Sequence, residues 1–144
     1  MPKNGHILFA KIVVGMKKKN NDPRHKKRQQ IIKLLFADEF YPIAKRETLK
    51  TAQNILKPII KRQKQIDQII GQAALKWPIE RINKIDLAIL RLAVWELCFS
   101  QKEPPKVIID EAVELAKEFG AENSPKFVNG VLGTVFKNYD EAKK

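Results

Sequence analysis

Basic side chains gather just after Asp22-Pro23, and they are the part of this 144-residue sequence with the clearest chemistry. Arg24, Lys26, Lys27 and Arg28 follow a pair that is typical of a helix start, a capping aspartate and then proline at the first helical position. Cations in a first helical turn are unfavourable by roughly 0.3 kcal/mol or more each, because the macrodipole is already positive there. A bound phosphate would offset both the positive end of the macrodipole and the charge of the side chains, so the cluster predicts contact with a polyanion. The alternative is a frayed, solvated basic end.

The distribution of charge along the chain favours the polyanion. The formal net charge is +12, and residues 1–76 contain 18 Lys and Arg against 5 Asp and Glu. Residues 77–144 contain 10 against 11. A generally basic composition would have affected both halves, whereas a single surface that meets a polyanion concentrates its charge in one part of the chain.

Aromatic side chains supply a second kind of contact, because unpaired bases of single-stranded RNA stack on them. Phe36 and Phe40 follow the basic cluster on the same predicted helix, while Phe119 and Phe127 bracket the loop 120–126. Phe127 stands beside Lys126 and on the flank of its predicted helix, so it is the best candidate of the four for a stacking platform.

Catalytic and metal-binding chemistry has little support in the sequence. It contains no Gly-rich phosphate loop, nucleophile elbow, metal-ligand spacing or Ser/His/Asp set. The densest carboxylates, Asp110, Glu111, Glu114 and Glu118, share the polar side of one predicted helix, which we expect to be a solvated face. The single cysteine, Cys98, excludes an internal disulfide and a multi-cysteine zinc site. We therefore expect a cytoplasmic, non-catalytic protein without a cofactor or metal.

The elements that position these side chains are predicted to be helices throughout. Hydrophobic residues recur at helical spacing, and no alternating strand pattern occurs outside the N-terminal segment. The fold class is therefore all-α, a single domain of about six to seven helices. Caps and prolines predict helices from Pro23 to about Phe40, from Pro42 to a break or kink at Pro58, from there to about Leu75, from Asn83, from Pro104-Pro105 to Gly120, and from Ser124-Pro125.

The N-terminal segment stands apart from this pattern. Residues 6–15 are apolar, but they are too few to span a membrane and carry a lysine in their midst. Met16 directly precedes three lysines and is an alternative start. We expect residues 1–22 to be a basic extension that is disordered or mis-annotated, and residues 23–144 to form the helical RNA-binding domain.

Three blocks of the C-terminal half resemble the NusB family of transcription antitermination factors. They are Ile85-Asp-Leu-Ala-Ile-Leu-Arg-Leu-Ala-Val-Trp-Glu-Leu97, Val107-Ile-Ile-Asp-Glu-Ala-Val-Glu-Leu-Ala-Lys-Glu-Phe-Gly120 and Lys126-Phe-Val-Asn-Gly-Val-Leu132. The segment 24–36 is similar to the family's Arg-rich first helix, although it is richer in lysine. The resemblance covers about residues 23–139 and is weakest between 41 and 78.

The resemblance implies a fold of two helical subdomains, binding of a boxA-type single-stranded RNA, and pairing with the ribosomal protein NusE within an RNA polymerase antitermination complex. Asp86 would contact NusE, whereas its simplest role from the sequence is helix capping. Carried over by position, the implied RNA contacts are Arg24, Lys26, Arg28, Phe36, Phe119, Asn123, Ser124, Lys126 and Phe127, and Lys27 joins them as a member of the basic cluster.

Two other functions remain open from the sequence. The chain is also compatible with a NusB-like RNA-binding module of an RNA cytosine methyltransferase, or with a basic DNA-binding structural protein. The resemblance does not fix the oligomeric state, and a homodimer is possible.

Overall fold

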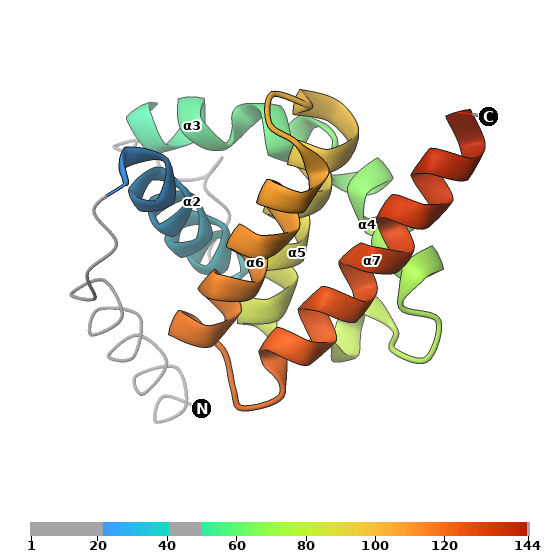
Figure 1. The fold of residues 1–144 in the computed structure, drawn as a ribbon. Coiled ribbons are helices and arrows are strands. Elements are labelled where there is room, and N and C mark those ends of the chain that lie inside the picture. The colour runs from blue at the N-terminus through green and yellow to red at the C-terminus, as the bar shows by residue number, and fades with distance from the viewer. Residues whose placement is uncertain (1–21, 41–49, 144) are drawn as a thin grey trace.

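The computed structural model describes residues 22–40 and 50–143, and these residues form six α-helices and no β-strand (Figure 1). In chain order the helices are α2 (Pro23–Phe40), α3 (Lys50–Lys61), α4 (Gln63–Ala73), α5 (Lys84–Trp95), α6 (Pro105–Phe119) and α7 (Ser124–Lys143). A 3₁₀ turn, η2 (Ile79–Arg81), precedes α5, and a π-helical turn, η3 (Glu96–Ser100), follows it. The all-α expectation is confirmed. The expected N-terminal extension and the helix start at Pro42 lie outside the described residues.

The helix ends follow the capping residues in the sequence. The backbone N–H of Arg24 donates to Asp22 Oδ1 at 2.9 Å, and that of Ile85 donates to Asn83 Oδ1 at the same distance. Each bond satisfies an amide that has no partner within its own helix. Helix α3 runs on past Pro58 and ends at Lys61, so the break between α3 and α4 falls at Arg62.

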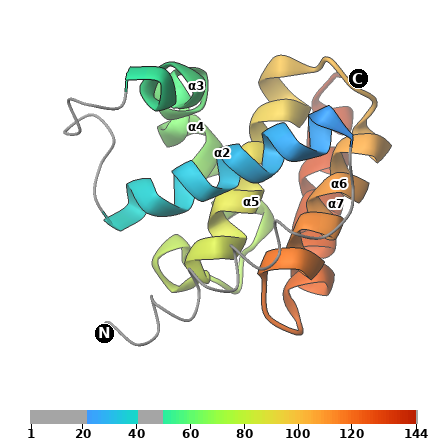
Figure 2. The ribbon, with the colours of Figure 1, turned by 90° about the vertical axis from the view of Figure 1, so that its left-hand side faces the viewer.

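Helix α5 is the centre of the fold. Ten of its residues are buried, and it contacts α2, α3, α4, α6 and α7. The two ribbon views show α2 crossing one side of α5 while α6 and α7 cover another (Figures 1 and 2). A helix that is apolar nearly all round must be enclosed by its neighbours, which is the arrangement seen. None of the described helices is long and apolar enough to cross a membrane.

A buried arginine fastens the central helix to two of its neighbours. Arg91 donates two hydrogen bonds of 2.9 Å to the carboxylate of Asp67 on α4 and one of 2.7 Å to Glu39 on α2. The guanidinium is almost fully buried, so these bonds compensate its loss of hydration. The C-terminal end of α2 and the middle of α4 are thereby held against α5.

Candidate nucleic-acid interface

The first turn of α2 presents three of the four predicted cations to solvent. The side chain of Arg24 is 71% exposed, and Lys26 and Lys27 are exposed as well. Arg24 is partly engaged, since its guanidinium lies 3.0 Å from Glu103 and 3.5 Å from Asp22. Neither lysine has an ion pair within the described part of the chain. These side chains remain available to a phosphate backbone.

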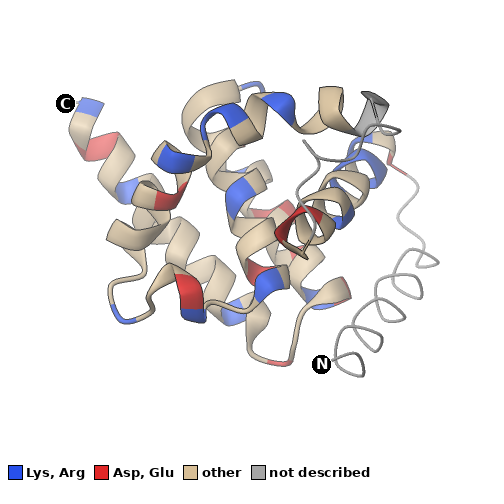
Figure 3. Cartoon of the chain, turned by 180° about the vertical axis from the view of Figure 1, so that it is seen from behind, with Lys and Arg blue, Asp and Glu red and all other residues tan. Residues whose placement is uncertain are grey.

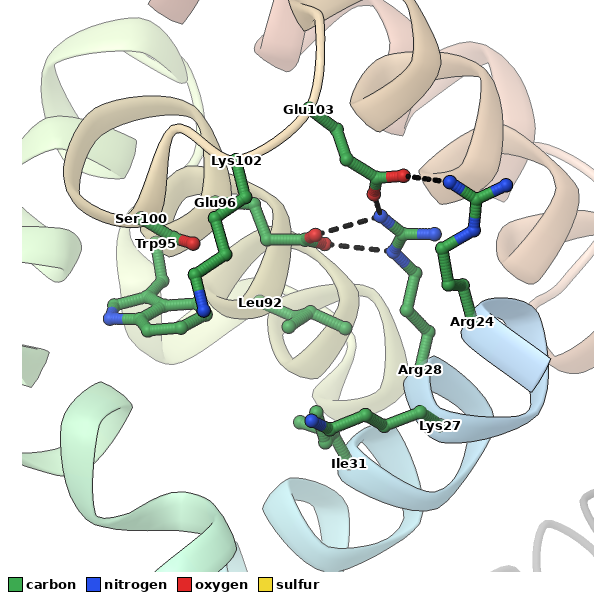
Figure 4. Close-up of a pocket in the computed structure, with 10 residues that line it drawn as sticks. All are labelled: Arg24, Lys27, Arg28, Ile31, Leu92, Trp95, Glu96, Ser100, Lys102 and Glu103. Carbon is green, nitrogen blue, oxygen red and sulfur yellow. Dashed lines mark hydrogen bonds and ion pairs between the residues drawn. The ribbon is translucent and has the colours of Figure 1, made fainter.

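Arg28, the fourth predicted cation, is directed into the protein instead. Its Nε and Nη2 donate to Glu96 at 2.9 and 2.8 Å, and Nη2 also donates to Glu103 (Figure 4). Its Nη1 donates to Glu111 on α6 at 3.2 Å. Burial by itself lowers the pKa of the guanidinium, but its hydrogen bonds to the carboxylates of Glu96 and Glu103 raise that pKa well above its ordinary value. All of this hydrogen bonding is internal. The structure therefore gives Arg28 a role in joining α2 to η3 and α6.

Two further polar side chains of α2 are buried against α6. The ring of His25 lies between two carboxylates, with Nδ1 3.0 Å from Glu111 and Nε2 facing Glu118. Gln29 donates to Glu118 at 2.7 Å. The expectation of a solvated acidic face on α6 is therefore wrong for Glu111 and Glu118, which bind α2. Glu111 and Glu118 lie two turns apart on one face of α6, and His25 and Gln29 lie one turn apart on one face of α2. This matching of polar residues on two helix faces is the sequence pattern that could have indicated the contact.

Two of the four predicted stacking platforms, Phe36 and Phe119, belong to the hydrophobic core. Phe119 is fully buried, and Phe36 is 8% exposed with its ring edge-to-face against Phe40, the centroids 5.0 Å apart. Neither ring offers a face to an incoming base. Both residues lie on the apolar stripes that bind α2 and α6 to α5, so the structure corrects the expectation that they contact RNA directly.

A third platform, Phe127, lines an open groove between α7 and the chain after α4. Its ring is edge-to-face with Trp77, the centroids 6.4 Å apart, and Trp77 is 52% exposed. The groove has a volume of about 360 Å³ and is flanked by the exposed cations Lys76 and Lys126. Gly130 also lines it, with space above its Cα that no other atom fills. Trp77 and Lys76 were missed in the sequence, where Trp77-Pro78 indicated only a turn.

The loop between α6 and α7 is held in place by Ser124. Its hydroxyl accepts a hydrogen bond from the backbone N–H of Ala121 at 2.9 Å and bonds to the carboxyl of Asp86. A Cβ on Gly120 would lie 2.5 Å from Ser124 Cβ and 2.7 Å from the carbonyl oxygen of Ala116, so only glycine fits there. Asn123 is exposed at the tip of the loop, whereas Ser124 is buried and orients it.

Asp86 lies beneath this loop in the first turn of α5. Its side chain is buried, and Oδ1 has no hydrogen-bond partner among the described residues. Burial raises the pKa of the Asp86 carboxyl, and the bond from Ser124 offsets only part of that rise. A buried carboxylate oxygen without a partner is costly, and a donor from a binding partner would relieve that cost.

The pH dependence of stability in Asp86→Asn tests whether the buried Asp86 carboxylate destabilises the folded protein. Because the folded protein disfavours the charged form, wild-type stability falls as pH rises through the raised pKa, and it is fully present only below the ordinary aspartate pKa of about 3.9. We expect Asp86→Asn to be more stable than wild type near pH 7 and nearly equal to it near pH 4. Urea unfolding at the two pH values measures the difference. A gap of the same size at both would show that ionisation of Asp86 is not its cause.

The structure thus divides the predicted residues into two exposed groups and a buried support. One group is the basic turn of α2, and the other is the Trp77–Phe127 groove with its neighbouring loop. Both adjoin the end of α6, because His25 and Gln29 of α2 contact Glu118, the residue before Phe119. Arg28, Phe36 and Phe119 hold the elements together beneath these surfaces.

Comparison with known proteins points to one family. The model of the NusB family matches residues 6–137, and so begins within the segment predicted to be an extension. The transcription antitermination protein NusB of Carboxydothermus hydrogenoformans is 34% identical over 137 residues, covering 82% of this chain and 95% of its own. That of Clostridium novyi is 39% identical over 130 residues, covering 79% and 98% respectively.

Solved structures agree with the sequence matches. NusB from T. maritima superposes with a TM-score of 0.71 at 34% identity, covering 82% of this chain and 93% of that one. A crystal structure of the antitermination factors NusB and NusE in complex with double-stranded RNA contains a chain with a TM-score of 0.66 at 25% identity. That match covers 81% of this chain and 99% of the other.

Proposed function

Because the chain belongs to the NusB family, we propose that it is a transcription antitermination protein that binds boxA-type RNA together with NusE. The observation that carries this is its similarity, over four fifths of its length, to a chain crystallised with NusE and RNA. The protein would act in the cytoplasm as an adaptor without catalytic activity, linking a nascent ribosomal transcript to the polymerase complex. The methyltransferase alternative is not favoured, because the relatives match over 95% and 98% of their own length and are named as antitermination proteins.

The RNA surface that we propose has two parts. Arg24, Lys26 and Lys27 on α2 would contact phosphates, since lysine meets phosphate as a point charge without the bidentate geometry of arginine. The exposed ring of Trp77, held edge-to-face against Phe127, would stack on an unpaired base, with Asn123, Lys76 and Lys126 beside it. Ser124 would set the position of the loop. This surface recognises single strands chiefly by stacking and charge.

Asp86 is our candidate for the NusE contact. Its buried oxygen without a partner supports this role, because a donor from another protein would find an acceptor already stripped of water. Asp86 lies under the 120–123 loop, so a protein contact there would be directly beside the proposed RNA surface.

Salt dependence of RNA affinity tests the proposal. With about four to six phosphate contacts, the log–log slope of affinity against salt should lie near −3 to −4 on a single-stranded boxA-like RNA. The double variant Lys26→Ala/Lys126→Ala removes one cation from each part and should make the slope shallower by about 1.4. The double variant Lys117→Ala/Lys137→Ala removes two exposed lysines elsewhere and should leave it unchanged.

Two further outcomes separate the alternatives. NusE should tighten RNA binding in the same titration, and duplex DNA should compete poorly with the single-stranded RNA. Stronger binding to duplex DNA, or slopes that the Lys26/Lys126 variant does not alter, would argue for the basic DNA-binding protein instead.

A further inference from the structure

Two neighbouring cavities meet at Trp95, and the first of them adjoins the basic turn of α2 at Arg24 and Lys27. The first, of about 290 Å³, lies between the start of α2 and the end of α5 and has Ile31, Leu92 and Trp95 as its apolar side (Figure 4). The second, of about 410 Å³, lies between α3 and η3 and is lined by Trp95 and Phe99. Trp95 and Ser100 line both cavities, so the two adjoin at these residues, and we refer to the pair as one depression.

Exposed lysines flank this depression. Lys27 and Lys102 flank the first cavity, where the close-up shows their side chains on the Trp95 side of the Arg28 cluster (Figure 4). Lys57 and Lys61 flank the second, on a helix that carries no acidic residue (Figure 3). All four lysines are exposed and have no ion pair within residues 22–40 and 50–143.

The only carboxylates among the lining residues of the two cavities are already engaged. Glu96 binds Arg28, and Glu103 binds both Arg28 and Arg24. The depression therefore presents a positive rim around an apolar floor. Such a floor fits a ligand whose anionic groups alternate with flat apolar ones.

Phe99 lies in the π-helical turn η3, which directly follows Trp95 at the end of α5. The backbone N–H of Gln101 donates to the carbonyl of Glu96 at 2.8 Å, a wider turn than that of an α-helix, and Gln101 then adopts a left-handed conformation with φ 53°. The ring of Phe99 lies 4.5 Å from the guanidinium carbon of Arg62, a cation–π contact. Trp95 is only half buried, beside this pair.

We propose that this depression is a second binding site for single-stranded RNA, in which an unpaired base contacts Trp95 while flanking phosphates meet Lys27 and Lys102 on one side and Lys57 and Lys61 on the other. Stacking on an aromatic ring and a cationic groove along the backbone are how proteins bind single strands without reading sequence. The site rests on the proposed function, since it extends the RNA contact of the first surface to nucleotides outside the boxA-type element.

The two tryptophans allow each surface to be observed separately. Trp77 and Trp95 are the only tryptophans in the chain, and they lie in the first groove and the second depression respectively. In Trp77→Phe, a boxA-like RNA extended at both ends by oligouridylate should quench the fluorescence of Trp95, and the same RNA without extensions should quench it much less. In Trp95→Phe, both RNAs should quench Trp77.

Charge variants give an independent measurement. Lys57→Ala/Lys61→Ala should weaken binding of the extended RNA roughly tenfold at about 0.1 M salt and make its salt slope shallower by about 1.4, with little effect on the short RNA. The control, Lys117→Ala/Lys137→Ala, removes two exposed lysines elsewhere and should change neither RNA.

The outcomes distinguish this inference from the proposed function. If Trp77 responds to RNA but Trp95 does not, and the Lys57/Lys61 variant binds normally, the second site is wrong and the first stands. If neither tryptophan responds, the proposed function itself fails. Stronger quenching of Trp95 by oligoglutamate than by the extended RNA would overturn the inference in favour of an acidic protein segment.

Discussion

Arg28→Ala is expected to lower the free energy of unfolding by about 3–5 kcal/mol. The substitution leaves Glu96, Glu103 and Glu111 facing one another, half buried, without the cation that compensates them. It also removes the bonds that join α2 to η3 and α6. Urea unfolding followed by circular dichroism measures the change.

Arg24→Ala is the matched control, since it removes an arginine one turn earlier on the same helix. That side chain is 71% exposed, so its ion pairs are screened by solvent and the loss should be at most about 1 kcal/mol. Near-wild-type stability of Arg28→Ala together with a large loss of RNA affinity would mean that Arg28 leaves the carboxylates to bind phosphate.

Phe119→Ala is expected to cost about 3–5 kcal/mol of stability, because it opens a cavity at a fully buried position at the end of α6. The effect on RNA affinity, measured where the variant is still folded, should be small. Thermal or urea unfolding gives the first quantity, and a titration of boxA-like RNA gives the second.

Phe127→Ala is the contrasting variant on the other side of the same loop. Its ring lies in the open groove against Trp77, so RNA affinity should fall by about 1–3 kcal/mol while stability changes less than in Phe119→Ala. If the two variants exchanged these effects, the assignment of Phe119 to the core and Phe127 to the surface would be reversed.

Helix type and most helix ends could be predicted from local chemistry. The caps at Asp22 and Asn83 and the helix starts at Pro105 and Ser124 depend on side chains within a few residues of the bonds they make. The exposure of Lys26 and Lys27 follows as well, because both lie off the apolar stripe of their helix. These features depend only on residues within or next to a single helix.

Residues whose role depends on a second helix were harder to assign. Arg28 and Phe36 both lie on the stripe of α2 that begins at His25 and continues through Ile32 and Leu35, so helical spacing marks all of them as inward. The charge of Arg28 favoured the surface, and only the carboxylates of η3 and α6 make its burial possible. The groove of Trp77 and Phe127 joins residues 50 positions apart, which no local pattern reveals.

The hydroxyl of Ser124 lies between the 120–123 loop and Asp86, so it would couple the proposed RNA contact to the proposed NusE contact. This hydroxyl accepts a hydrogen bond from the backbone N–H of Ala121 and donates one to the carboxyl of Asp86. The loop that we propose for RNA and the candidate NusE contact therefore share one hydroxyl group. A partner that donates a new hydrogen bond to Asp86 would alter the bond between Asp86 and Ser124, and with it the bond from Ala121 to the same hydroxyl. Thermodynamic linkage then requires reciprocity: the factor by which NusE raises the affinity for RNA equals the factor by which RNA raises the affinity for NusE.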